Sequence, residues 1–79
     1  MRAKKSAKKA ATLSKFIGGR IRTMRTERSL TQKLFAKKSK IAISYVSMLE
    51  RGERLPSLDM LASIATTFGV KLQDMVGGF

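Results

Sequence analysis

The sequence predicts an all-α fold, a compact bundle of five helices. Apolar residues recur at intervals of three and four, which is the spacing that places them on one face of a helix. No segment alternates apolar and polar residues as a strand does, and no internal repeat is present. Hydroxyl residues precede several of the apolar stretches and glycines follow them, as is typical of helix starts and ends.

The helices are expected at about 13–26, 31–38, 43–51 and 57–68, with a short fifth helix near the C-terminus. In the first and fourth helices the predicted buried faces are Leu13, Ile17, Ile21 and Met24, and Leu58, Leu61, Ile64, Ala65 and Phe68. Phe35, Ala36, Val46 and Leu49 should face inward from the second and third. Thr31 and Ser57 are the predicted N-caps, and Gly69 is the predicted end of the fourth helix. The pair Gly18-Gly19 marks either a close backbone approach or a helix that starts late.

The charge of the chain is strongly positive and unevenly placed. The net charge is +12, and fourteen of the 17 Lys and Arg residues lie in positions 1–40, whereas four of the five acids lie beyond them. Such a field attracts polyanions, while solubility alone would be served better by mixed charges. Residues 1–11 are predicted to be a mobile basic arm before a domain at 12–79, with Lys4, Lys5, Lys8 and Lys9 available for phosphates. The alternatives are a tail without a role and an arm that binds RNA.

Composition also excludes several classes of site. The chain has no Cys and no His, so disulfides, thiolate sites and imidazole-ligated zinc are excluded. No paired carboxylates or activated serine suggest catalysis, and the acids are too scattered for a cation cage. We therefore expect no enzyme, no cofactor and no metal. No apolar run reaches the roughly 20 residues of a membrane span, so we expect a cytoplasmic protein, associated with the nucleoid. A domain this small is expected to gain stability by self-association.

The most informative segments are Leu30–Ala36 and Ile43–Gly52, which predict two short helices joined by a tight turn. Such an arrangement presents one helix to a groove of duplex DNA. Further residues fit the same pattern, namely Ile21-Arg22, Arg25, Pro56-Ser57-Leu58, Leu61, Ile64-Ala65 and Gly69-Val70. From about Phe16 to Val76 the chain thus resembles the Cro/cI-type (Xre) helix-turn-helix family.

The resemblance implies a lambda-repressor-like, stand-alone transcriptional regulator that binds a pseudo-palindromic operator as a homodimer, with residues 43–51 in the major groove. It places Ile43, Ser44, Ser47 and Met48 at base edges, and Thr31, Gln32, Lys33, Tyr45, Arg51 and Arg54 at phosphates. It also implies an ion pair between Arg25 and Glu50. The dimer surface is expected at Leu72, Met75, Val76 and Phe79, unless these residues only close the core of the monomer. A regulatory protein is a further expected partner.

The chain departs from the family pattern at three places. Lys40 stands where the turn usually has Gly, which predicts a non-glycine residue at positive φ. Ala42 cannot cap the third helix with a side chain. Ile43 and Met48 bring apolar groups to the reading face, and the natural target of such groups is the thymine methyl. Affinity should therefore come mainly from phosphate contacts, and specificity partly from DNA shape. The alternative is a protein-docking module that uses an exposed apolar face of Leu34, Ile43 and Met48, with the arm holding nucleic acid non-specifically.

Overall fold

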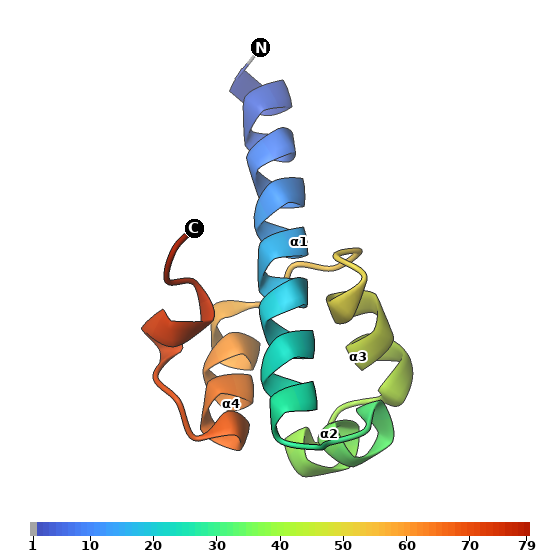
Figure 1. The fold of residues 1–79 in the computed structure, drawn as a ribbon. Helices are drawn as coiled ribbons and strands as arrows, with labels where there is room; N and C mark the ends of the chain where they lie inside the picture. Colours follow the sequence, from blue (N-terminus) through green and yellow to red (C-terminus); the bar gives the residue numbers. More distant parts are fainter. Residues whose placement is uncertain (1) are drawn as a thin grey trace.

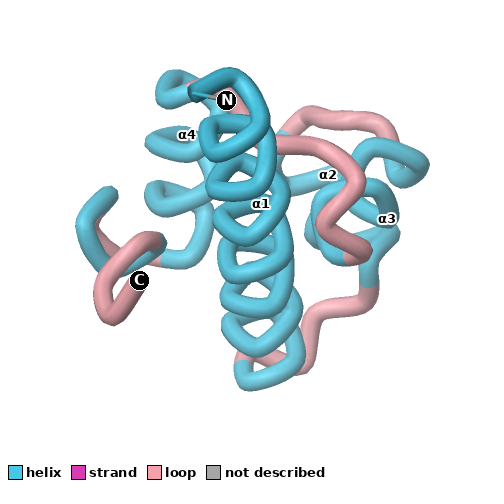
Figure 2. Tube along the Cα trace, turned by 90° about the horizontal axis from the view of Figure 1, so that it is seen from above, coloured by secondary structure: helices cyan, strands magenta, loops and turns pink. Residues whose placement is uncertain are grey.

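A long first helix forms the axis around which the other elements pack. The computed structural model describes residues 2–79, with side chains described from residue 11 onward. Its elements are α1 (Arg2–Glu27), α2 (Gln32–Ser39), α3 (Ile43–Glu50), α4 (Leu58–Phe68) and a 3-10 helix, η1 (Leu72–Met75). Seen from two directions, α4 and η1 lie on one side of α1, and α2 and α3 lie on the other (Figures 1 and 2). The N-terminal half of α1 projects beyond the rest of the molecule (Figure 1).

The all-α prediction is confirmed in outline, but two details of the predicted bundle are wrong. The fifth element is a single 3-10 turn, not an α-helix, so the described residues form four α-helices. Only Val76 separates its last residue from glycines 77 and 78, and glycine disfavours continuation of a helix. The first helix begins at Arg2 instead of near Leu13.

The early start of α1 has a simple physical cause. Residues 2–12 are mostly Ala and Lys, which are good helix formers. Extending an existing helix also needs no new nucleus, whereas repulsion between lysines four residues apart costs only a few tenths of a kcal/mol per pair. The mobility and the phosphate contacts expected of residues 1–11 stay predictions, and the side chains of Lys4, Lys5, Lys8 and Lys9 lie outside the described ones.

Helix boundaries follow the local chemistry of the sequence. The hydroxyl of Thr31 accepts a hydrogen bond from the N–H of Leu34 at 3.1 Å, and that of Ser57 accepts one from the N–H of Met60 at the same distance. Gly69 ends α4 in the left-handed region with φ 72°. All three predicted boundaries are confirmed, because each depends only on a capping side chain or a glycine.

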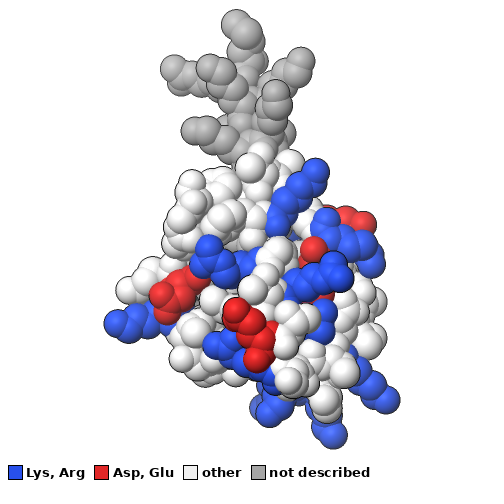
Figure 3. All heavy atoms as spheres, viewed as in Figure 1, with Lys and Arg blue, Asp and Glu red and all other residues white. Residues whose placement is uncertain are grey.

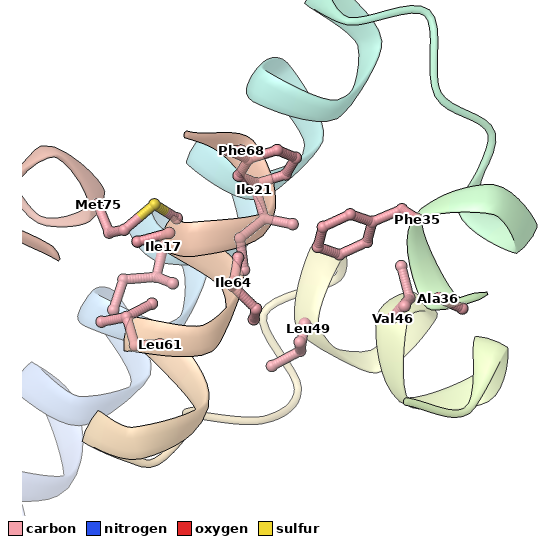
Figure 4. Packing of buried hydrophobic residues seen from close by; sticks show 11 residues of the cluster. Ile17, Ile21, Phe35, Ala36, Val46, Leu49, Leu61, Ile64, Phe68 and Met75 are labelled. Carbon is pink, nitrogen blue, oxygen red and sulfur yellow. The ribbon is translucent and has the colours of Figure 1, made fainter. Parts of the chain in front are cut away.

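The core joins both sides of α1. Figure 4 shows Ile17, Leu61 and Met75 at one end, Ile21, Ile64 and Leu49 in the middle, and Phe35, Val46 and Ala36 at the other end. The rings of Phe35 and Phe68 stack with centroids 4.8 Å apart. Leu58, predicted to be buried, is 69% exposed. It is the first residue of α4, next to the Ser57 cap, so its side chain lies beyond the buried stripe that begins at Leu61.

Gly18 is the point where α1 crosses the end of α3. A Cβ atom at this position would lie 2.2 Å from the carbonyl oxygen of Leu49, which is far inside van der Waals contact. A Cβ atom at Gly19 would have no such neighbour within 4 Å. The first of the two sequence interpretations, a close backbone approach, therefore holds for Gly18 alone.

This difference predicts opposite effects of alanine at the two glycines. Gly18→Ala forces α1 and α3 apart and should lower the free energy of unfolding by about 1–3 kcal/mol, as overpacking does. Gly19→Ala meets no neighbour and should raise it by about 0.5–1 kcal/mol through helix propensity. Urea unfolding followed by circular dichroism measures both. Equal effects of the two substitutions would contradict the close approach.

Candidate nucleic-acid interface

The turn between α2 and α3 has the backbone that the sequence predicts. Lys40 is left-handed, with φ 58° and ψ 44°, although it is not glycine. The N–H of Ile41 donates to the carbonyl of Ala36 at 3.0 Å, which closes the end of α2. Ala42 begins α3 without a side-chain cap. Both predicted departures are therefore present, and the turn holds α2 and α3 in a helix-turn-helix.

A nearly buried ion pair fixes α3 to α1. Arg25 donates to both carboxylate oxygens of Glu50, from Nε at 2.6 Å and from Nη2 at 3.0 Å. Its third nitrogen, Nη1, donates to the carbonyl of Leu30 at 2.7 Å. The side chains of Arg25 and Glu50 are only 12% and 4% exposed. The hydrogen bond to Glu50 raises the pKa of Arg25 further above its usual value, so the guanidinium stays charged.

Gln32 and Ser47 extend this pair into a network across three helices. The Gln32 amide donates from Nε2 to Oε1 of Glu50 at 3.1 Å. The Ser47 hydroxyl donates to Oε1 of Gln32 at 3.0 Å. The family resemblance places Gln32 at a phosphate and Ser47 at a base edge, so the bond between these two side chains was not expected. Nothing in the local sequence signals this inward bond, because its partner lies on another helix.

The outer side of α3 remains open. Ile43 is 49% exposed, and Ser44 beside it is also exposed. Met48 is half-buried, so less of it is accessible than the sequence suggested. Leu34 of α2 is exposed as well. The structure thus narrows the fully open part of the predicted reading face to Ile43 and Ser44.

Basic side chains flank this surface. Figure 3 shows Lys and Arg projecting at the end of the molecule formed by α2, and others beside α3 with single acids among them. Of the predicted phosphate contacts, Thr31, Lys33, Arg51 and Arg54 are exposed. Tyr45 is half-buried and packs against the core. Arg51 already forms an ion pair with Glu53.

The residues predicted to form a dimer surface divide into two groups. Met75 is completely buried in the core of this chain, where it cannot contact a second copy. Leu72 and Val76 are half-buried, and Phe79 is exposed with its ring edge-to-face on Phe16 at 5.3 Å.

Arg20 holds this C-terminal segment against α1. Its guanidinium donates to the carbonyls of Asp74 and Gly77 and stacks over the ring of Phe16. The sequence contains no signal for this role, because carbonyl acceptors have no residue signature and these lie more than fifty positions away.

No group of three or more potential metal ligands comes together in the part of the chain that the structure describes. None of the described helices combines the length and the apolar character that a membrane span requires.

The ion pair predicts a large effect of one neutralising substitution. Glu50→Gln leaves the guanidinium of Arg25 nearly buried without its counter-charge, which should lower the free energy of unfolding by about 3 kcal/mol. Glu27→Gln is the matched control, because Glu27 is exposed and lies 3.9 Å from Arg28, so its loss should change stability by less than about 0.5 kcal/mol. Thermal and urea unfolding measure both. A similar, small loss in the two variants would exclude the pair as a determinant of the fold.

Comparisons with known proteins agree with this geometry. A family model described as Helix-turn-helix matches residues 21–75. The HTH-type transcriptional regulator DdrOP3 of Deinococcus deserti is 42% identical over 59 residues, which are 75% of this chain and 46% of that relative. The immunity repressor protein of Bacillus phage phi105 is 38% identical over 61 residues, which are 77% of this chain and 42% of the repressor. The chain thus spans less than half the length of these two relatives.

A solved structure of similar size matches as well. The restriction-modification controller protein C.AhdI from Aeromonas hydrophila superposes with a TM-score of 0.75 at 32% identity, covering 78% of this chain and 94% of that protein. The family match extends over more than half of the chain and includes the whole α2–turn–α3 unit. The chain belongs to the Cro/cI-type (Xre) helix-turn-helix family of transcriptional regulators.

Proposed function

We propose that this chain is a sequence-specific DNA-binding transcriptional regulator that binds a pseudo-palindromic operator as a homodimer, with α3 in the major groove. One observation carries the proposal. The inner side of α3 is fixed by the Arg25–Glu50 network, while its outer side is open at Ile43 and Ser44. A rigid helix with an open polar and apolar edge is what direct readout of base pairs requires.

The chemistry of the open edge limits what it reads. The Ser44 hydroxyl both donates and accepts, so it suits several base edges. Ile43 offers only apolar contact, for which the thymine methyl is the natural target. The hydroxyl of Ser47 is bonded inward to Gln32 and the side chain of Met48 is half-buried. Only the exposed parts of these two side chains are therefore accessible to bases. Direct readout is therefore modest, and DNA shape supplies part of the specificity.

Phosphates supply most of the affinity in this proposal. The N–H groups at the start of a helix have no intrahelical partner, and Thr31 satisfies that of Leu34. The N–H groups of Gln32 and Lys33 are then available to a backbone phosphate, whose charge the helix dipole favours. Tyr45, Arg51, Arg54 and the lysines of residues 1–11 are further phosphate contacts. Each neutralised phosphate adds about 0.9 to the slope of log affinity against log salt concentration, so binding should be steeply salt-dependent.

The surface of the C-terminal segment is the proposed contact with a second copy of the chain. Leu72, Val76 and Phe79 leave apolar area at the protein surface, and Arg20 holds the segment in place against α1. Two-fold symmetry of the protein would match that of a pseudo-palindromic operator.

The protein-docking alternative starts from the exposure of Leu34 and Ile43. The relatives do not favour it, because they are named as transcriptional regulators and a repressor. We also propose that the protein has no catalytic activity and that it is located on the nucleoid.

Alanine at the open edge of α3 tests the reading role. In the double variant Ile43→Ala, Ser44→Ala, affinity for the operator selected from random DNA should fall at least tenfold, since loss of the match at one base pair of a site costs about 1–3 kcal/mol and a dimer has two half-sites. Folding should persist, because both side chains are exposed. Fluorescence anisotropy at two salt concentrations measures the affinity.

The matched control is Leu58→Ala, Ser63→Ala, which removes an exposed apolar and an exposed hydroxyl side chain from α4. It should leave operator affinity unchanged. If the α3 variant binds the operator as the control does, α3 does not read DNA and the docking alternative gains support.

The dimer proposal has its own test. Phe79→Ala with Val76→Ala removes apolar surface of the C-terminal segment, so sedimentation velocity should show a shift from dimer to monomer at equal concentration. Circular dichroism checks that the helices persist. A dimer that survives this double substitution, or a wild-type chain that is monomeric, would contradict the assigned surface.

A further inference from the structure

The loop that follows α3 contains an ion pair at a position proposed to contact DNA. Arg51 is the C-terminal cap of α3, and its guanidinium donates to both oxygens of Glu53, from Nε at 2.9 Å and from Nη2 at 3.0 Å. The two side chains are 56% and 53% exposed. A carboxylate therefore fills the fork of the guanidinium at the protein surface, beside the end of the reading helix.

Gly52 brings a third charged side chain to the same loop. It has φ 72°, and a Cβ atom there would lie 2.6 Å from Cγ of Lys15. The aliphatic part of Lys15 thus packs directly on the loop, and the lysine itself is exposed. Lys15 therefore lies beside a loop that also carries Arg51 and Arg54, and Glu53 is the acid of this loop.

The geometry of the pair is also that of phosphate recognition. An arginine fork binds a carboxylate and a phosphate by the same two parallel N–H···O bonds. One fork cannot hold both groups, and an uncovered carboxylate beside the DNA backbone is repelled. The exchange is feasible, because an exposed ion pair is weak and is screened by salt. The bond from Arg51 lowers the pKa of Glu53, so the carboxylate is charged at neutral pH.

We propose that Glu53 occupies the phosphate position of Arg51 in the free protein, and that it thereby lowers the affinity of the loop for DNA backbone of any sequence. Binding exchanges a carboxylate for a phosphate on the same guanidinium. The inference rests on the proposed function, because it assigns a competitor to one of its phosphate contacts. The chain has a net charge of +12, which favours binding to any DNA. The need to displace Glu53 from Arg51 weakens this non-specific binding.

Four proteins test the exchange, namely the wild type, Glu53→Gln, Arg51→Gln and the double variant. The probe is a short random-sequence duplex, and its affinity is measured by fluorescence anisotropy over a range of salt concentrations. Glu53→Gln should tighten binding by about two- to five-fold, which corresponds to the loss of an exposed ion pair. It should also steepen the salt slope by up to about 0.9. Arg51→Gln should weaken binding.

Two comparisons separate the exchange from a general charge effect. Glu27→Gln makes the same change of charge in the last turn of α1, at an acid that does not pair with Arg51, and should tighten binding less than Glu53→Gln does. In the Arg51→Gln background, Glu53→Gln should give no more than this general effect, since Glu53 acts through Arg51. An undiminished gain in that background would show that Glu53 acts by its own repulsion of DNA, which overturns the proposal.

A DNA-free measurement completes the design. The pKa of Glu53, followed by NMR, should rise towards its ordinary value in Arg51→Gln, and no change would overturn the pair in solution. The result also separates this inference from the proposed function. A wild type that binds no duplex overturns the function, whereas a wild type that binds, with Glu53→Gln equal to it, overturns only the role of Glu53.

Discussion

The ion pair between Arg25 and Glu50 is the interaction on which the orientation of α3 depends. Glu50 is 4% exposed, so its charge is stable there only with a partner in good geometry. Arg25 supplies that partner from α1, and Gln32 adds a bond from α2. Close contact at Gly18 brings α1 near enough for this pairing. The charge requirement and the close contact together constrain the relative placement of the three helices.

The same network limits the proposed reading surface of α3. Ser47 donates inward to Gln32, so a residue that local sequence assigns to base contact also serves to hold α2 against α3. Rigidity of the helix-turn-helix and breadth of its reading face are therefore in competition. What remains fully open is short and partly apolar, at Ile43 and Ser44. Under the proposed function, so short a surface needs additional affinity from the DNA backbone, which the basic residues around the motif are suited to supply.

Features that depend on local chemistry were predictable from the sequence, and features that depend on distant contacts were not. The caps at Thr31 and Ser57 and the left-handed Lys40 follow from side-chain type and position in a turn. Leu58 is exposed although its spacing predicts burial, because periodicity does not indicate where the core ends. Met75 and Arg20 have roles set by packing between the two ends of the chain. Among the site residues, the Arg25–Glu50 pair followed from the family resemblance, whereas the inward turn of Ser47 required the structure.

The acids of this basic chain show how its charge is organised. Glu50 belongs to the buried pair, Asp59 lies in the first turn of α4 and Asp74 caps η1, whereas Glu27 is exposed in the last turn of α1. None of these four forms an ion pair with a lysine whose side chain the structure describes. Glu53 differs, because its partner is an exposed cation beside the proposed reading helix. An acid in that position contributes little to stability, since both groups are exposed, and in our proposal it acts instead on what Arg51 binds.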